Sequence, residues 1–350
     1  MTPLLLTLAV SMGETLEGQD LSKGSYARLG LGGGVFTRVN LSESDLRGTD
    51  LREAVFDQCD LRGVLATGAQ MRRAVFNRCL LDHADLRRCD LHGAVFAECD
   101  LVHAQLADAM LAMATLSKCK LDHAVLRAAC LDSALLSQSS LLDVCLDGTS
   151  WQYTTTSECE LTQLSWAGAR MLRNSFFRTS LKNKSFDGLQ LEGCQFSFAD
   201  LAGADFSGVG LRQCNFQGAQ LDGARFVQAN APASLFCDAA GAGVDFSGAD
   251  LRQALFTGAR LPRSRFNGCQ LHQAHFAGAV LGGAQLQNAE LGHADFRHAD
   301  LSGADLRGAR MTRTVLHGSR TDEALMSDRA SALETDPDLQ AAERWQPLAA

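Results

Sequence analysis

Several features that mark enzymes are missing from this sequence of 350 residues. It contains no phosphate-binding loop, no nucleophile elbow and no motif of paired carboxylates. The Gly32-Gly33-Gly34 run lacks the strand, the lysine and the helix that a phosphate-binding loop requires. We therefore expect no enzyme activity and no cofactor.

A membrane-spanning hydrophobic run is also missing. Met1 to Val10 is apolar, but it is too short for a membrane span and lacks the basic leader and cleavage site of a signal peptide. We therefore expect no membrane contact. Proline is scarce, with five residues, whereas glycine is frequent, with 32. This balance is typical of a regular array with many turns.

The 12 cysteines contain no CxxC pair and no Cys/His zinc pattern. Nine of them occupy a small, repeating position that alanine otherwise holds: Cys59, Cys79, Cys89, Cys99, Cys119, Cys159, Cys194, Cys214 and Cys269. A buried thiol at such a position packs like a small apolar side chain. We expect packed thiols without disulfides, which favours a reducing compartment.

What the sequence does contain is a period of five. A large apolar residue, called the centre below, recurs at residue numbers that end in 1 or 6, from Leu16 to Leu316, and a small residue stands two positions before it. This period fits neither the 3.6 of a helix nor the 2 of a strand. A chain that turns a corner every five residues would point every centre to one axis and bury it against the turns above and below.

Units such as Ala199 to Gly203 (ADLAG) and Ala304 to Gly308 (ADLRG) have the motif A(D/N)LxX. On this motif the chain resembles the pentapeptide-repeat family over roughly residues 16–320. The resemblance implies an all-β fold, a right-handed quadrilateral β-helix with four units in each coil. With coils stacked at the strand spacing of ~4.8 Å, about 15 coils would form a rod on the order of 70 Å long.

The phenylalanines agree with a four-sided coil. One group recurs every 20 residues and should stack on one face: Phe36, Phe56, Phe76 and Phe96. In a second group, phenylalanine stands at every second centre and should occupy two opposite faces: Phe176, Phe186, Phe196, Phe206 and onward to Phe276. Together these rings form the expected core ladder.

We expect three parts: an N-terminal cap at 1–20, the repeat domain at 21–320, and a helical C-terminal cap or tail at 321–350. In the last part, TDEALMSDRASALE (321–334) predicts a short helix with acids in its first turn. Asp336-Pro337 predicts the start of a second helix. A homodimer contact through this cap is a further expectation.

Two stretches depart from the motif without loss of frame, at 147–185 and 229–244. The first predicts either a locally distorted coil or a recognition patch made by Trp151, Tyr153 and Trp166, since Trp and Tyr often anchor interfaces. The second has small residues at two centres, and its Pro232 predicts a bulge or kink.

Three histidines, His83, His103 and His123, are 20 residues apart and should stack outward beside Asp82 and Asp122. A His/Asp ladder could bind a metal. Adjacent coils would give a straight row rather than a converging cage, so surface stacking is favoured and no metal site is expected.

The net charge of −8 lies at the chain ends. Residues 321–350 carry −5 and residues 1–20 carry −3, which leaves 21–320 neutral, with 30 acidic and 30 basic residues. One side of the coil nevertheless carries an acidic stripe: Glu43, Asp60, Asp82, Asp100, Asp122, Asp143 and Glu160, continuing to Asp200 and Asp222. No basic stripe of comparable strength is present, so direct binding of nucleic acid is not expected.

These observations favour a non-enzymatic, rod-like scaffold that binds other proteins. The resemblance implies a bacterial, cytoplasmic protein, and some long family members accompany secretion machinery. It also implies an alternative, because some members imitate DNA and act on DNA gyrase, a type II topoisomerase. Here the acidic stripe would be the imitating surface, although DNA carries a charge every ~1.7 Å and the repeat domain is neutral overall.

Overall fold

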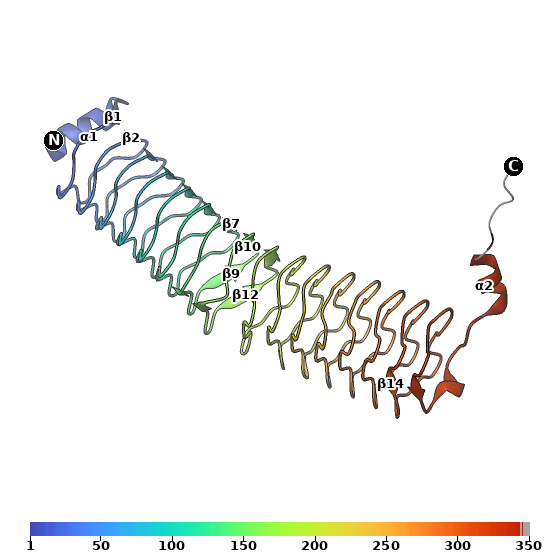
Figure 1. The fold of residues 1–350 in the computed structure, drawn as a ribbon. Helices are drawn as coiled ribbons and strands as arrows, with labels where there is room; N and C mark the ends of the chain where they lie inside the picture. Colours follow the sequence, from blue (N-terminus) through green and yellow to red (C-terminus); the bar gives the residue numbers. More distant parts are fainter. Residues whose placement is uncertain (344, 346–350) are drawn as a thin grey trace, which may run out of the picture. The chain divides into compact units, whose positions relative to one another are not determined.

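The computed structural model describes residues 1–343 and 345, and the chain divides into two compact units, Met1–Ser180 and Leu181–Ala350. Within each unit the chain coils into a parallel β-solenoid in which each residue pairs with the one 20 positions later, as Val35 pairs with Val55 and Gln195 with Asn215 (Figure 1). Four five-residue units therefore make one coil. This confirms the predicted quadrilateral β-helix.

The period of five arises from one buried pattern and one corner. Centres are buried, and so are the small residues two positions before them. Two residues after nearly every centre, the backbone φ is positive, as at Lys23 (55°) and Gly33 (68°). On most sides the next amide donates to the carbonyl of the centre, as Gly34 N does to Leu31 O at 3.2 Å. Positive φ at that place in a four-residue turn is the signature of a type II turn.

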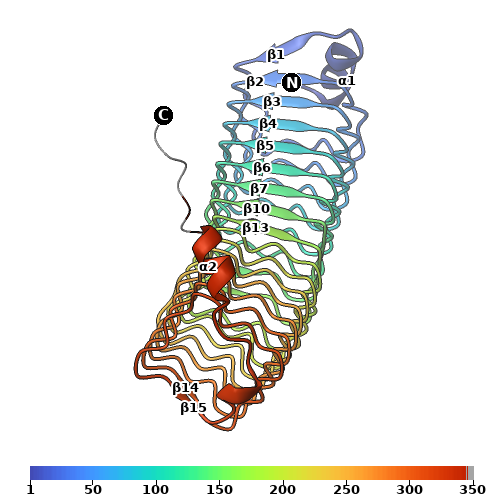
Figure 2. The same ribbon diagram turned by 90° about the vertical axis from the view of Figure 1, so that its right-hand side faces the viewer.

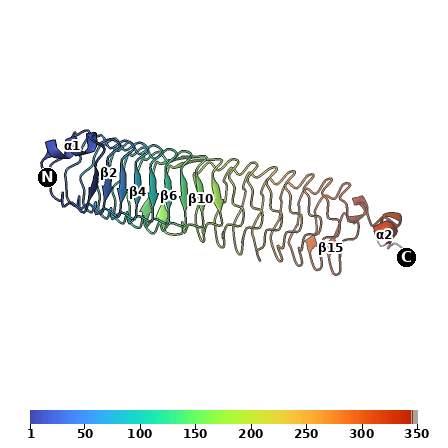
Figure 3. The same cartoon turned by 90° about the horizontal axis from the view of Figure 1, so that it is seen from above.

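Unit 1 begins with helix α1 (Pro3–Ser11), whose Leu6 and Val10 are buried and which lies at the first coil (Figure 3). One side of this unit is a parallel sheet, called the sheet face below (Figure 2). Its strands, in order, are β1 (Thr15–Glu17), β2 (Val35–Thr37), β3 (Val55–Asp57), β4 (Val75–Asn77), β5 (Val95–Ala97), β6 (Thr115–Ser117), β7 (Leu135–Ser137), β10 (Thr155–Ser157) and β13 (Ser175–Phe177).

The stretch predicted as irregular, 147–185, keeps the frame of the coil. Short parallel pairs form on two further sides of unit 1 near its end. These are β8 (Val144–Cys145) with β11 (Leu164–Ser165), and β9 (Ser150–Gln152) with β12 (Arg170–Leu172). Part of this stretch is therefore more extended than the regular coils.

Unit 2 is held by isolated bridges between its coils until β14 (Asp305–Leu306) pairs with β15 (Leu325–Met326). The prediction of a helix over 321–334 was wrong, because a turn, β15 and the 3-10 helix η1 (Arg329–Ser331) occupy that stretch. Leu325 N bonds to Ala304 O, so the stretch continues the solenoid ladder instead of forming a helix.

The second predicted helix is present as α2 (Pro337–Glu343). Asp336 Oδ1 accepts the amides of Asp338 and Leu339, at 2.9 and 3.1 Å, which is the capping contact that its sequence predicts. The predicted C-terminal cap also includes residue 344 and residues 346–350, which lie outside the described residues.

The second stretch predicted as irregular, 229–244, is not kinked. Its residues pair in register with the coils on both sides, as Asn230 does with Asp250 and Ala240 with Arg260. Gly241 stands at a centre where no side chain fits. A Cβ atom added to it would lie 2.5 Å from the carbonyl carbon of Leu221. The predicted bulge or kink was therefore wrong. The small residue leaves room for the backbone of the preceding coil, and the coil stays regular.

The phenylalanine rings stack as predicted. Phe36, Phe56 and Phe76 lie in parallel with ring centroids 4.8 and 5.0 Å apart. In unit 2, rings from opposite sides also meet edge to face inside the coil, as Phe226 and Phe236 do at 5.6 Å and 84°. The core is therefore aromatic from both sides in unit 2.

The cysteines form no disulfide, as predicted. Burial raises the pKa of Cys269 to about 12, and that of Cys89 to about 12. These thiols are therefore protonated core residues at neutral pH. No helix in the described part of the chain is long and apolar enough to cross a membrane.

Candidate functional surfaces

Two of the three residues predicted as a recognition patch are core residues. Trp151 is fully buried, with its indole Nε1 donating to Thr149 Oγ1 at 2.8 Å, and Trp166 is 6% exposed. Both stand at centres, so their rings point to the axis of the coil. The patch prediction was therefore wrong for both tryptophans.

Tyr153, by contrast, is 53% exposed, and its hydroxyl accepts a hydrogen bond from Arg173 Nη1 at 3.5 Å. The Tyr153 face is defined here as Met110, Met113, Tyr153 and Leu172. Register places them on one side, because Met110 pairs with Cys130, Cys130 with Ser150, and Leu172 with Gln152. Met113 is 60% exposed. Sequence reasoning missed the two methionines and Leu172, although apolar residues at outward positions were a readable signal.

The acidic stripe lies on one side of unit 1 but is interrupted, since Asp60 pairs with Leu80, Leu80 with Asp100, and Asp100 with Lys120. Several of its carboxylates stabilise the coil. Asp60 accepts the amide of Arg62 and pairs with its guanidinium at 2.6 Å, and Asp122 accepts the amide of Leu142 at 2.9 Å. The members exposed to solvent are Glu43, Asp143 and Glu160. Nearby bases offset part of even this charge, since Lys23 lies 3.8 Å from Glu43.

The predicted histidine ladder is present beside this stripe. His83, His103 and His123 stack with ring centroids 4.7 and 5.0 Å apart and nearly parallel planes. Ligand atoms around a small metal ion lie ~3.3–3.5 Å apart, because each sits ~2.0–2.1 Å from the ion. Rings stacked in parallel at coil spacing do not converge on such a point, so the ladder is a stacked surface row.

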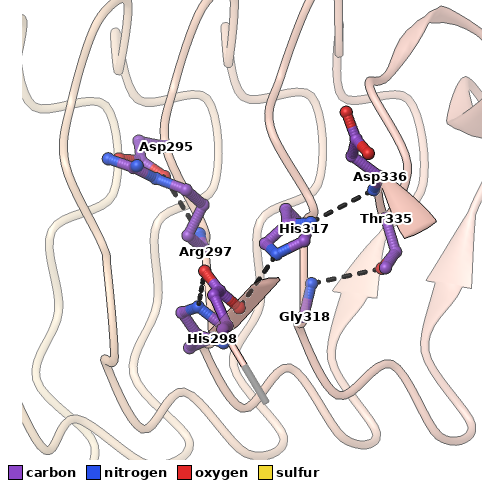
Figure 4. Close-up of polar contacts among 8 residues, drawn as sticks. Asp295, Arg297, His298, His317, Gly318, Thr335 and Asp336 are labelled. Carbon is purple, nitrogen blue, oxygen red and sulfur yellow. Dashed lines mark hydrogen bonds and ion pairs between the residues drawn. The ribbon is translucent and has the colours of Figure 1, made fainter. Parts of the chain in front are cut away.

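Unit 2 carries a different histidine site at its C-terminal end (Figure 4). His298 Nε2 and His317 Nε2 lie 3.3 and 3.2 Å from the two carboxylate oxygens of Glu343, at the end of α2. His317 is buried, and its Nδ1 accepts the amide of Asp336 at 3.1 Å. The hydrogen bonds from His317 and His298 lower the pKa of the Glu343 carboxyl. Sequence reasoning missed this site because Glu343 lies outside the repeat.

A cavity of about 690 Å³ adjoins this site. It is lined by apolar side chains from the coil and the C-terminal segment, among them Val315, Leu333 and Leu339, and by the polar Arg297 and His317. Arg297 forms a bidentate pair with Asp295, with N–O distances of 3.0 and 2.7 Å. The Arg297 guanidinium is therefore held in place by the Asp295 carboxylate.

These features define a class: a parallel β-solenoid of five-residue units whose outward side chains form its functional surfaces. The family model of pentapeptide repeats matches residues 35–73, 59–96, 69–104, 99–138 and 279–318, and that of the pentapeptide repeat region matches 189–266. The chain belongs to the pentapeptide-repeat family. No curated protein sequence matches the chain.

Solved structures of three pentapeptide repeat proteins are similar. HetL, involved in heterocyst differentiation regulation in the cyanobacterium Nostoc sp. strain PCC 7120, is 22% identical over 94% of this chain and 98% of its own, with a TM-score of 0.25. QnrB1, a plasmid-mediated fluoroquinolone resistance protein, is 18% identical over 58% and 96%, with a TM-score of 0.25. A protein of the Arabidopsis thaliana thylakoid lumen is 31% identical over 32% and 69%, with a TM-score of 0.16.

Proposed function

We propose that this chain is a non-enzymatic scaffold that binds a protein partner through the Tyr153 face. The observation that carries the proposal is the exposure of Met110, Met113, Tyr153 and Leu172 on one side of unit 1, over four successive coils, where the repeat elsewhere places mostly polar residues. Tyrosine supplies a large amphipathic contact at low entropic cost, and methionine adapts to irregular surfaces. Apolar side chains gathered on an otherwise polar surface are typical of interaction sites.

The proposal is tested by capturing partners from a bacterial lysate with the intact protein and with a Met113→Ser, Tyr153→Ala variant. The matched control is Leu65→Ala, because Leu65 is exposed in the same unit on a different side. We expect the double variant to lose the captured protein while the control keeps it. Equal capture by all three proteins would contradict the proposal.

The second candidate is a DNA-imitating modulator of DNA gyrase. One observation favours it: Glu43, Asp143 and Glu160 expose carboxylates on one side of unit 1. Charge reversal of these three to Lys leaves the coil-stabilising Asp60 and Asp122 intact. If wild-type protein alters gyrase supercoiling and the reversed variant does not, this candidate replaces the first. A supercoiling assay unaffected by wild-type protein removes it.

Three further parts of the proposal are the cellular compartment, the oligomeric state and the cellular role. Buried thiols without disulfides favour a reducing compartment such as the bacterial cytoplasm. A homodimer through the C-terminal cap is supported by the exposure of Leu339 and Trp345. Light scattering on a Leu339→Ser, Trp345→Ala variant tests it, with a dimer expected only for the wild type. An accessory role in bacterial secretion rests on the family resemblance alone.

A further inference from the structure

His298, His317 and Glu343 bring three metal-ligating side chains together in unit 2. His298 stands two residues after its centre, His317 one residue after the centre of the next coil, and Glu343 ends α2. Their ligand atoms all lie within 4.8 Å of one another. Among residues 1–343 and 345, this is the one cluster of three such side chains close enough to hold a metal ion. We propose that these three residues bind a divalent transition metal ion of the zinc class.

The distances fit such an ion. Metal–nitrogen and metal–oxygen bonds of ~2.0–2.2 Å place neighbouring ligand atoms of a tetrahedral site ~3.3–3.5 Å apart. The two nitrogen–oxygen distances here, one to each oxygen of the Glu343 carboxylate, are 3.3 and 3.2 Å, and all the ligand atoms lie within 4.8 Å, so a small shift of the side chains closes the site on an ion. Two imidazoles and one carboxylate are a common zinc ligand set and leave a fourth position for water. The exposed side chain of His298 gives the ion a path from solvent.

The hydrogen bonds of His317 add a consequence of binding. Because Nδ1 accepts the amide of Asp336, the proton of the neutral ring lies on Nε2, where it faces Glu343 (Figure 4). A metal ion on Nε2 takes the place of that proton, so the neutral ring then carries its proton on Nδ1. The Asp336 amide loses its acceptor and faces the Nδ1–H donor, so these two groups must move apart. Loss of one such hydrogen bond weakens metal binding by about tenfold. The affinity gained from three metal–ligand bonds is larger than this loss.

Binding therefore frees the Asp336 amide just before α2, while the Asp336 carboxylate still caps the helix and Glu343 holds its end. The bond from Gly318 N to Thr335 Oγ1, at 3.1 Å, does not depend on the ring proton and stays in place. The change is thus confined to the Asp336 amide. This proposal is independent of the Tyr153 face, which belongs to the other unit.

The experiment is a calorimetric titration of the full chain in metal-free buffer with Zn²⁺. We expect one ion at this site for each chain, and a loss of affinity of at least tenfold in His298→Ala and in Glu343→Gln. Glutamine keeps the length and can still accept a hydrogen bond, but it removes the anionic ligand. Both residues are solvent-accessible, so neither change threatens the core. His317→Ala is unsuitable as a test variant, because His317 is buried against the C-terminal segment and its removal would also disturb the packing there.

The matched control is a His272→Ala, His293→Ala variant. These two rings lie on neighbouring coils of the same unit, edge to face at 5.4 Å, much as His298 and His317 lie at 5.5 Å. Among the described residues they form no three-ligand group with a carboxylate. We expect this variant to bind Zn²⁺ like the wild type.

Amide hydrogen exchange gives a second readout, with faster exchange expected at Asp336 when Zn²⁺ is bound. Co²⁺ in place of Zn²⁺ should give the visible absorption of a tetrahedral site, which His298→Ala abolishes. Wild-type protein that binds no Zn²⁺, or His298→Ala and Glu343→Gln variants that bind it as tightly as the wild type, would overturn the proposal.

Discussion

The two units bury the same pattern of large and small residues but turn one of their corners differently. In unit 2, the third residue after each phenylalanine centre donates its amide to the centre, as Ala199 N does to Phe196 O at 3.1 Å and Ala219 N to Phe216 O at 3.0 Å. On the sheet face of unit 1, from β1 to β10, the backbone is extended instead, and only at β13 does Thr179 N bond to Phe176 O, at 3.3 Å. There the equivalent amide is free to bond to a side chain of the next coil, and Cys119 N does so with Ser139 Oγ at 3.0 Å.

The small buried residue therefore selects the corner. At the sheet face this residue, except Val39, is one that can accept an amide proton, namely Cys59, Cys79, Cys99, Cys119, Ser139, Cys159 and Thr179. The equivalent amides of unit 2 belong mostly to alanines, which accept nothing, so the backbone closes a type II turn. β-Branched residues before the centre, such as Val35 and Val55, also favour the extended form.

The largest effect that we expect is at the tryptophan of unit 1. Trp151→Ala should lower the free energy of unfolding by about 3–5 kcal/mol, because it removes a fully buried ring. It also leaves the Thr149 hydroxyl without the indole donor. Urea unfolding followed by circular dichroism measures this. Tyr153→Ala is the control, with a change within about 0.5 kcal/mol. Equal stability of the two variants would place the Trp151 ring at the surface.

The second prediction compares phenylalanines of the two units. Phe236→Ala and Phe76→Ala should each cost about 3–5 kcal/mol, with the larger loss at Phe236. Phe76 contacts stacked rings on its own side, at 5.0 and 4.7 Å. Phe236 has such neighbours at 4.7 Å and also meets Phe226 and Phe246 edge to face.

The same urea titration measures both variants. Edge-to-face pairs contribute about 0.5–1.5 kcal/mol beyond burial, which sets the expected difference. Equal losses would mean that the aromatic core of unit 2 adds nothing to the leucine core of unit 1.

The third prediction concerns the corner. The Cys79 amide makes no bond to its centre Phe76 and faces the Cys99 thiol, so we expect Cys99→Ala to leave that buried amide without an acceptor, at a cost of about 1–3 kcal/mol. Cys99→Ser should cost less, because Ser139 plays the same role with a hydroxyl. In unit 2, the Cys194 amide keeps its bond to Leu191 O at 3.1 Å, so Cys214→Ala should cost less than Cys99→Ala.

Differential scanning calorimetry of the three cysteine variants is the measurement. If Cys99→Ala and Cys214→Ala shift the melting temperature equally, the thiol does not act as the amide acceptor. The selection of the corner by the small residue would then be wrong.

The phase of the repeat was enough to predict the solenoid, because each burial position is fixed by residue number alone. It also indicated the burial of Trp151 and Trp166, whose numbers mark them as centres. The prediction of a recognition patch failed for these two residues because it gave residue type more weight than position in the repeat. The difference between the corners was readable in principle from valine and cysteine on one side. Glu343 could not have been placed beside His317, since a helix outside the repeat carries no register with the coils.

The smallest effect should come from the Asp-x-Arg pairs that both units share. The guanidinium of Arg87 holds the pKa of Asp85 below its usual value, and that of Arg252 does the same for Asp250. A carboxyl with a depressed pKa in the folded state stabilises the protein above its unfolded pKa of about 3.9, and this stabilisation is lost as pH falls through the folded value. Arg87→Gln and Arg252→Gln should each cost at most about 1 kcal/mol at pH 7, because exposed pairs are screened.

Urea titrations from pH 7 down to pH 2 measure this effect, and the difference between wild type and variant should shrink below pH ~4 in both units. A difference that persists at low pH would mean that the arginine acts by packing its aliphatic chain over the coil. A difference in only one unit would show that the two surfaces, although built from the same motif, are not electrostatically equivalent.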